Sequence, residues 1–398
     1  MKILVINCGS SSLKYEIYRM PEHQSLGKGL VERIGLPEGK VIQEFEGKKY
    51  HRCLEIPNHR IAFEQMMQAI LDKENGILNS PTEISGIGHR VVHGGDQYSE
   101  SVIIDADVIK AIEINCELAP LHNPANLTGI REAQAIFPLV PQVAVFDTAF
   151  HQTLPPSAYL YGIPREFYEK YRIRRYGFHG TSHRYVADLA VQILKRSPEN
   201  TNLITCHLGN GASITAIQAG RSVDTSMGFT PLEGLMMGTR SGDLDPSIIF
   251  YLEERGFDFH EVHNILNKKS GLLGLSGISS DLRDIEAAAE EGNQDAQEAL
   301  ETYAYRIRRY IGAYVANLIK VDALVFTGGI GQYGVKMRQR ICSRLENLGI
   351  HINRELNQQV GANPGIISRD YSPISIVVVP TNEELQIAID TCNLISND

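Results

Sequence analysis

Several residues that can do chemistry lie in or beside segments rich in glycine. Arg90 lies near the end of an apolar run that leads into a His-Gly-Gly turn, and Arg240 lies in the glycine-rich segment 220–246. His179 is flanked by glycines at the start of a predicted helix. Two guanidinium groups and an imidazole can neutralise and orient a transferring phosphoryl group, because charge-assisted hydrogen bonds to anions are strong. These types of side chain therefore indicate phosphoryl-transfer chemistry.

Each of these residues also has an ordinary structural interpretation. Arg240 can instead form an ion pair with Asp243 or Asp245. The spacing of His179 and His183 suits a metal, but no acidic third ligand lies nearby, which favours hydrogen bonding to a phosphoryl oxygen. A histidine held in the core is the remaining alternative.

Two carboxylates come shortly after apolar strands, Asp147 and Glu383. In α/β folds the loops at the carboxyl ends of strands line the ligand crevice. Carboxylates at such positions serve as ligands of Mg²⁺ or as acid/base groups.

Three glycine-rich turns follow predicted strands, at residues 7–12, 209–211 and 328–331. Glycine lets the main chain approach a ligand, and successive amide groups there form an anion-binding nest. Together with Lys14 beside the first turn, they predict phosphate binding. The sequence has no GxxxxGK[ST] loop, and its GxGxxG match at 329–334 lies too near the C-terminus for the usual dinucleotide-binding unit.

Strands and helices alternate along the chain, which predicts an α/β fold. The two strand–turn–strand units around residues 9 and 209 predict a weak internal repeat. We expect strands at 3–8, 13–18, 84–92, 142–146, 203–207, 213–217, 323–326 and 376–379. We expect helices at 61–71, 107–118, 126–136, 303–319, 335–348 and 383–395, and a long functional loop at 220–246.

The bulk composition excludes several classes of protein. At about 100–200 residues per domain, 398 residues predict two domains. A net charge of −9 without a basic run disfavours a nucleic-acid partner, and no apolar stretch is long enough to span a membrane. Six cysteines without CxxC spacing, and no secretory signal, predict reduced thiols in a cytoplasmic enzyme.

Long segments of the chain resemble the acetate kinase family. The strings VINCGSSSLKY (residues 5–15) and MGFTPLEGLMMGTRSGDLDP (227–246) are similar to its signatures, and GHRVVHGG, APLHNPAN, RRYGFHGTSHRYV, HLGNGAS, SGLLGLSGISSDLRD, FTGGIG and PTNEE follow the family in order. The resemblance implies reversible, Mg²⁺-dependent transfer of phosphate from ATP to acetate, by direct in-line displacement, within acetyl-CoA biosynthesis. Mn²⁺ is an alternative metal, and a homodimer is implied.

The resemblance also implies the fold and its domains. It predicts two duplicated actin-like (ribonuclease H-like) α/β domains with a nucleotide cleft between them. We expect residues 1–150 plus 384–398 to form the N-terminal domain. Residues 151–383 would form the nucleotide-binding and dimerisation domain.

Functional residues are carried over from the family one position at a time. The implied catalytic residues are Arg90, Asp147, His179 and Arg240, and the implied metal site is formed by Asn7 and Glu383. The implied phosphate and nucleotide contacts are Ser10, Ser12, Lys14, His207, Leu208, Gly209, Asn210, Gly211, Asp281, Leu282, Arg283, Gly329, Ile330 and Gly331. The implied acid pocket is lined by Arg90, Val92, Leu121, His122, Phe178 and Pro231.

Three details refine these expectations. Acetate is already an anion, so Asp147 is expected to orient an arginine or the metal rather than act as an obligatory base. Val92 favours acetate, because the propionate-preferring relatives tend to carry a smaller residue there. The chain has Gln332-Tyr333 where the family commonly has Glu-Asn. The alternative functions are those of a propionate or butyrate kinase of the same family, and of a non-catalytic actin-like ATP switch.

Overall fold

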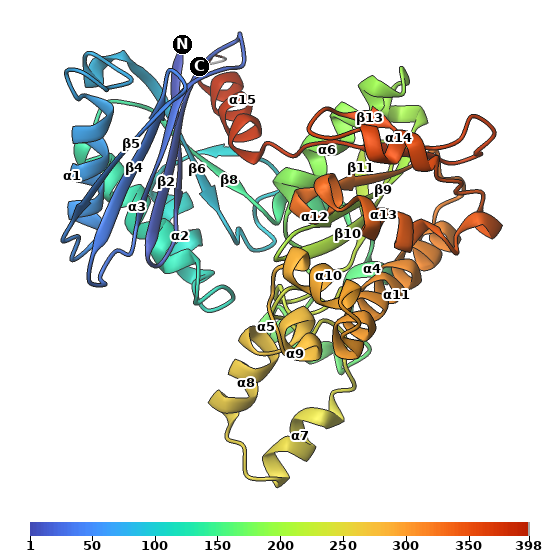
Figure 1. Cartoon of the computed structure of the whole chain (residues 1–398). Coiled ribbons are helices and arrows are strands. Elements are labelled where there is room, and N and C mark those ends of the chain that lie inside the picture. The colour runs from blue at the N-terminus through green and yellow to red at the C-terminus, as the bar shows by residue number, and fades with distance from the viewer. Residues whose placement is uncertain (397–398) are drawn as a thin grey trace. The chain divides into compact units, whose positions relative to one another are not determined.

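The structure is a computed structural model, and it describes residues 1–396. The chain forms two compact units (Figure 1). Unit 1 comprises Met1–Gln152 and Asn382–Asp398, and unit 2 comprises Thr153–Thr381. Each unit is described below by itself.

Unit 1 is built on a mixed eight-stranded sheet of order β5-β4-β3-β2-β1-β6-β8-β7. Strands β1 and β2 are antiparallel, whereas β1, β6 and β8 run parallel. The carboxyl ends of these three parallel strands therefore lie at the same edge of the sheet. The strands are β1 Lys2–Cys8, β2 Ser12–Arg19, β3 Gln24–Glu32, β4 Gly39–Phe45, β5 Lys48–Leu54, β6 Ile84–Val91, β7 Val102–Ile103 and β8 Gln142–Phe146.

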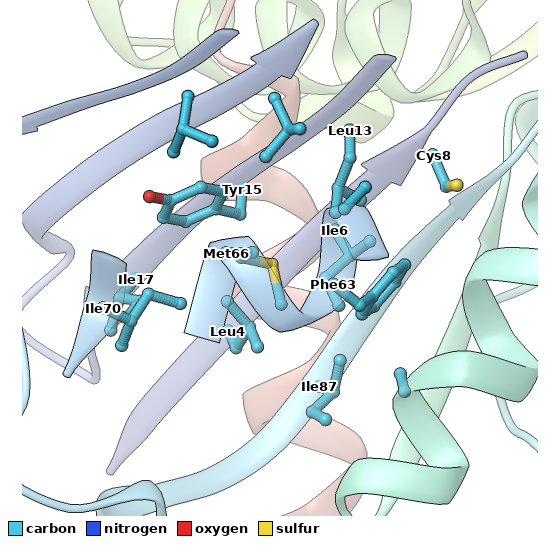
Figure 2. Close-up of a cluster of buried hydrophobic side chains, with 14 of the residues drawn as sticks. Leu4, Ile6, Cys8, Leu13, Tyr15, Ile17, Phe63, Met66, Ile70 and Ile87 are labelled. Atoms are coloured by element: carbon cyan, nitrogen blue, oxygen red, sulfur yellow. The ribbon is translucent and has the colours of Figure 1, made fainter. Parts of the chain in front are cut away.

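At strand β1 both faces of the unit 1 sheet are buried, and the side chains of β1 alternate between them. Leu4 and Ile6 point to one face and pack with Phe63 and Met66 of α1 (His59–Ile70) (Figure 2). Ile3 and Val5 point to the other face, against α15 (Glu383–Ser396). Because successive side chains of a strand point to opposite faces, β1 packs against α1 on one face and against the C-terminal helix α15 on the other. The remaining helices of this unit are α2 Ala106–Ile114 and α3 Asn123–Ile136, with the 3-10 turns η1 Pro81–Glu83 and η2 Ala149–Thr153, the latter ending in unit 2.

Unit 2 has a six-stranded sheet of order β11-β10-β9-β12-β14-β13. Its strands are β9 Asn202–Leu208, β10 Ala212–Gln218, β11 Arg221–Thr225, β12 Ala323–Thr327, β13 Gly365–Ile366 and β14 Ser375–Val378. Its helices are α4 Pro156–Tyr159, α5 Arg165–Tyr171, α6 Gly180–Ile193, α7 Ser247–Glu254, α8 Phe259–Lys268, α9 Gly271–Ser276, α10 Leu282–Glu290, α11 Gln294–Asn317, α12 Gly328–Tyr333, α13 Val335–Cys342 and α14 Arg354–Gln359. The 3-10 turns are η3 Pro198–Asn200 and η4 Glu346–Leu348.

The two sheets share one topology. The order β3-β2-β1-β6-β8 in unit 1 corresponds to β11-β10-β9-β12-β14 in unit 2. In both, the first three strands form an antiparallel meander and the next two run parallel to the first. The predicted α/β class and the internal duplication are confirmed.

Three local predictions were wrong. Residues 328–331 begin helix α12 rather than form an open turn, because Gly328 has a φ of +74° that turns the chain directly from β12 into the helix. Residues 221–225 of the predicted loop form β11, paired with β10. The helix predicted at 303–319 starts at Gln294, where the Asn293 side chain caps it.

Two further findings concern the whole described chain. Within residues 1–396, no helix combines the length and apolar character required to cross a bilayer. All six cysteines are free thiols.

Candidate active site

A buried ion pair lies at the sheet edge of unit 1 where β6 and β8 end. Asp147 follows β8 and is 1% exposed, and its two carboxylate oxygens accept hydrogen bonds from Nε and Nη2 of Arg90 at 3.3 and 2.5 Å. The strands are in parallel register, with Arg90 opposite Val145, so both side chains leave the sheet at neighbouring positions. This two-point contact fixes the guanidinium plane of Arg90.

Glu383 is the first residue of α15 and lies near the same pair. Its carboxylate is 3.8 Å from Nε of Arg90. Burial raises the pKa of Glu383 to about 7, against the opposing effect of Arg90, and the neighbouring Asp147 raises it further. Burial by itself lowers the pKa of Arg90, but the charges of Asp147 and Glu383 outweigh burial and raise it overall. Arg90 therefore remains a cation.

The first hairpin turn connects β1 to β2 beside these groups. Asn7 pairs with Lys14 across the hairpin, and both line a pocket of about 240 Å³ together with Glu384. The Gly9 amide donates to the Ser12 carbonyl at 2.8 Å, which closes the turn that contains Ser10. Ser10 and Lys14 are exposed, and Ser12 is half-buried. Ser10 thus lies in the turn, and Ser12 and Lys14 lie at the start of β2 beside it.

The donor set of the predicted metal site is an amide and a carboxylate, from Asn7 and Glu383. Mg²⁺ is bound by oxygen ligands, commonly one or two carboxylates with several waters and substrate phosphates. The two residues fit that chemistry for a site completed by water and nucleotide. Within residues 1–396, no group of three or more histidine, cysteine or acidic side chains is arranged to hold a metal.

The unit 1 part of the predicted acid pocket lies between β6 and α3. Val92 is 5% exposed, and its amide donates to Oδ1 of Asn126, whose Nδ2 in turn donates to the Cys8 carbonyl. His122 caps the start of α3, and Leu121 before it is 59% exposed. Asn126 thus ties the Val92 segment to the end of β1, a link that sequence reasoning missed.

In unit 2, the second hairpin turn supports the long loop that was predicted at residues 220–246, which we call the active-site loop. The Gly238 amide donates to the Asn210 carbonyl at 2.9 Å, so the loop is fastened to the turn at 209–211. A Cβ placed on Gly211 would lie 3.4 Å from Nε2 of His179 and 3.9 Å from Nη1 of Arg240. The structure therefore brings Arg240 and His179 together at this glycine.

Arg240 does not form the ion pair that was its alternative interpretation. Among residues 1–396, its guanidinium has no carboxylate within ion-pair distance, and Nη1 lies 3.8 Å from the Met237 sulfur. Asp243 instead accepts from the Gly234 amide and the Tyr310 hydroxyl. Burial lowers the pKa of Arg240. An arginine held this way is available to an anion.

His179 caps helix α6 with a left-handed backbone, at a φ of +58°. Its Nδ1 lies 2.9 Å from Oγ of Ser213, and its ring stacks on His207 at 4.3 Å between centroids. Both ring nitrogens of His183 contact hydroxyl groups at 2.7 Å, from Thr205 and Ser213. These contacts support hydrogen-bonding roles for both histidines rather than the metal alternative.

A pocket of about 510 Å³ in unit 2 collects residues from three separate segments. Of the predicted nucleotide residues, it is lined by Gly209, Asn210, Asp281, Leu282, Arg283, Gly329 and Ile330. Its other lining residues are Ser280, Glu286, Tyr333 and Gly334. Tyr333 belongs to the departure from the family pattern noted in the sequence, whereas Ser280, Glu286 and Gly334 were not predicted as contacts. Gly331 and Leu208 lie beside it in the core, and His207 lies against His179.

Arg175 holds the start of the active-site loop, a role that sequence reasoning also missed. Its Nη1 donates to the carbonyls of Thr225 and Ser226, and its Nη2 donates to Glu233 at 2.6 Å. Phe178 is buried and Pro231 is half-buried, on the two segments that Arg175 connects. The pair Arg175 and Glu233 was visible in the sequence only as two isolated charges.

Comparisons with known proteins agree along the whole chain. The model of the acetokinase family matches residues 2–389. An acetate kinase of Pseudothermotoga lettingae is 53% identical, covering 100% of this chain and 98% of that protein. The crystal structure of Porphyromonas gingivalis acetate kinase is 46% identical with a TM-score of 0.96, and a propionate kinase from Francisella tularensis is 45% identical with a TM-score of 0.92, each covering 99% of both chains. The chain belongs to the acetokinase family.

Proposed function

We propose that the protein catalyses the reversible transfer of the γ-phosphoryl group of ATP to acetate, giving ADP and acetyl phosphate. The observation that carries the proposal is the pairing of Arg240, without a carboxylate partner among residues 1–396, with His179 at the Gly211 turn. Curated relatives at 53% identity over nearly their full lengths are named acetate kinase, which supports the same substrate.

Arg90 would bind the acetate carboxylate, and Asp147 would position it. Acetate needs no base, since it is an anion at neutral pH. The obstacle is its approach to a polyanionic phosphate. The two-point contact with Asp147 holds Arg90 in one orientation, so that little reorganisation is required when acetate binds.

Arg240 and His179 would stabilise the phosphoryl group during an in-line displacement. The charge in such a transition state spreads over the equatorial oxygens of the transferring group, where a guanidinium and an imidazole N–H are favourable. Because Arg240 is half-buried, its hydrogen bonds to an anion are stronger than they would be in bulk water.

The nucleotide would occupy the pocket of unit 2 that is lined by Asn210, Asp281, Arg283 and Ile330. Ser10, Ser12 and Lys14 of the first turn would contact its phosphates. Asn7 and Glu383 would hold Mg²⁺, or Mn²⁺ as an alternative, with Glu383 acting through water. The bound cation supplies charge neutralisation on the phosphate oxygens.

Propionate is the second candidate acceptor, favoured by the similarity to a propionate kinase at 45% identity. Buried Val92 supports acetate as the better substrate, because one methylene in a closed apolar pocket changes binding by about 1–3 kcal/mol. Leu121, His122, Phe178 and Pro231 would complete this pocket. A non-catalytic ATP switch would have no use for Arg90, His179 and Arg240 in these arrangements.

We further propose a cytoplasmic homodimer. Helices α7 and α8 project from unit 2 (Figure 1) and expose Phe250, Tyr251 and Phe259 at 54–66%. Exposed apolar groups concentrated on two neighbouring helices are typical of an interface, and here the proposed occupant is a second copy. Six free thiols support a reducing compartment.

The test is to incubate purified protein with Mg-ATP and acetate, and to trap acetyl phosphate as its hydroxamate. Arg240→Ala should lower kcat at least about 100-fold, as expected for loss of a group that stabilises transition-state charge. Arg165→Ala, which removes an exposed arginine that forms an ion pair with Glu169, is the control and should match the unchanged protein. No hydroxamate with acetate, propionate or butyrate would overturn the proposal.

A further inference from the structure

A continuous row of hydrogen-bonding groups leads from the core of unit 2 to His179. The Thr205 hydroxyl lies 2.7 Å from Nδ1 of His183, and Nε2 of His183 lies 2.7 Å from the Ser213 hydroxyl. That hydroxyl lies 2.9 Å from Nδ1 of His179. Thr205, His183 and Ser213 are each 0% exposed. Water therefore does not compete for these contacts.

Only one arrangement of the protons in this row gives every buried donor an acceptor. The Thr205 hydroxyl makes no other side-chain hydrogen bond within residues 1–396, so its proton is satisfied only if it points to Nδ1 of His183. His183 then carries its proton on Nε2 and donates to Ser213. Ser213 in turn donates its single proton to Nδ1 of His179.

The opposite direction leaves a buried proton without an acceptor. If Nδ1 of His179 donated to Ser213, then Ser213 would donate to His183, and His183 would donate to Thr205. The Thr205 hydroxyl proton would then have no partner in the described chain, which is costly in a buried site. If His179 were protonated on both ring nitrogens, the Ser213 hydroxyl proton would likewise have no acceptor.

We propose that Thr205, His183 and Ser213 are positioning residues that fix the tautomer of His179, with the proton on Nε2. Nε2 is the nitrogen that lies beside Gly211 and Arg240. The row thus presents an N–H donor, rather than a lone pair, toward the place where the transferring phosphoryl group would lie. The inference concerns the catalytic step of the function proposed above and rests on that function for its purpose.

The tautomer can be read directly in the free enzyme. Long-range proton–nitrogen correlation spectra of histidine-labelled protein distinguish the protonated from the unprotonated ring nitrogen, and His179→Gln identifies the signals. We expect Nε2 of His179 to be protonated and Nδ1 not. In Ser213→Ala and in the isosteric Thr205→Val, we expect a mixture of tautomers at His179.

Kinetics of the same variants give the second readout. Ser213→Ala should lower kcat by about 10-fold to 100-fold, the range seen when a partner that orients a functional histidine is lost, with little change in the KM values. Thr215→Val is the matched control, because Thr215 is another buried hydroxyl on the same face of β10 and bonds only within the sheet. It should keep both the tautomer and the rate.

The outcomes are separable from the proposed function. The spectra require no substrate, so a protein that makes no acetyl phosphate can still show the expected tautomer. Protonation of His179 on Nδ1 with Nε2 bare would overturn the inference. So would a Ser213→Ala variant that keeps the His179 signals and the rate of the unchanged protein.

Discussion

Replacing Asp147 by Asn tests whether the buried carboxylate acts through Arg90. The change keeps the shape of the side chain but removes the charge, and it places an amide N–H₂ group against one of the two guanidinium donors. Asp147 is 1% exposed and Arg90 is 23% exposed, so solvent screens the pair only weakly. Truncating one partner of such a pair typically costs about 2–5 kcal/mol.

This cost converts into a measurable loss of activity. At about 1.4 kcal/mol for each tenfold change, kcat/KM for acetate should fall by about 30-fold to several thousand-fold, with a raised KM for acetate. The assay is hydroxamate trapping at varied acetate and saturating Mg-ATP. The control is Glu83→Gln, which removes the ion pair between Lys2 and Glu83 at the opposite end of β1. A folded Asp147→Asn enzyme with near-normal kcat/KM would refute the reasoning.

Three further predictions address specificity and stability. Val92→Ala should raise the ratio of kcat/KM for propionate over acetate by about 10-fold or more, since it opens a buried position; an unchanged ratio would remove Val92 from the pocket. Burial lowers the pKa of His89 from 6.5 to about 4. The free energy of unfolding should therefore fall by about 3 kcal/mol as pH drops from 6.5 to 4, because the unfolded chain binds a proton that the folded chain does not. Urea titrations of His89→Gln should lack that contribution. Arg338→Met should lower the free energy of unfolding by about 3 kcal/mol in the same titrations, because fully buried Arg338 donates to the Gly331 and Gln332 carbonyls at the end of α12. A change below about 0.5 kcal/mol would show that those carbonyls find other donors.

The central strands of both sheets were predictable because apolar runs and glycine turns mark them locally, whereas β3, β4 and β5 of unit 1 were not predicted. Strand β8 was predicted at its observed bounds, Gln142–Phe146, since four of its five residues are apolar and it lies between Pro141 and Asp147. The two hairpins were found in the same way. Their shared topology required the structure, because the pairing of β1 with β6, and of β9 with β12, joins residues far apart in the chain.

The errors have local physical causes. The first turns of α11 carry only a short apolar stripe, Ala296, Ala299 and Leu300, among polar residues, and the prediction that began the helix at Tyr303 overlooked it. Gly328 was predicted to be part of a turn, but its positive φ lets helix α12 begin directly after β12. The segment that forms β11 was hidden in a glycine-rich stretch, and it is a strand because β10 offers it a paired edge.

At the candidate site, residue types were predictable but their partners were not. Arg90 and Asp147 were both singled out from the sequence, yet only the parallel register of β6 and β8 shows that they bond to each other. Arg240 had acidic neighbours in sequence, and the fold gives those carboxylates other donors. Ser213 and Thr205 carried no signal at all, because a buried hydroxyl on a strand is ordinary until its neighbour is known.

The central claim is a single in-line transfer of the phosphoryl group, positioned by the chain's own cations without a phosphorylated enzyme. Its most direct test is the stereochemical course at phosphorus, using ATP made chiral at the γ-phosphoryl group with oxygen isotopes and acetate as acceptor. The account predicts inversion of configuration in the acetyl phosphate formed. Net retention would require two successive transfers and would contradict it.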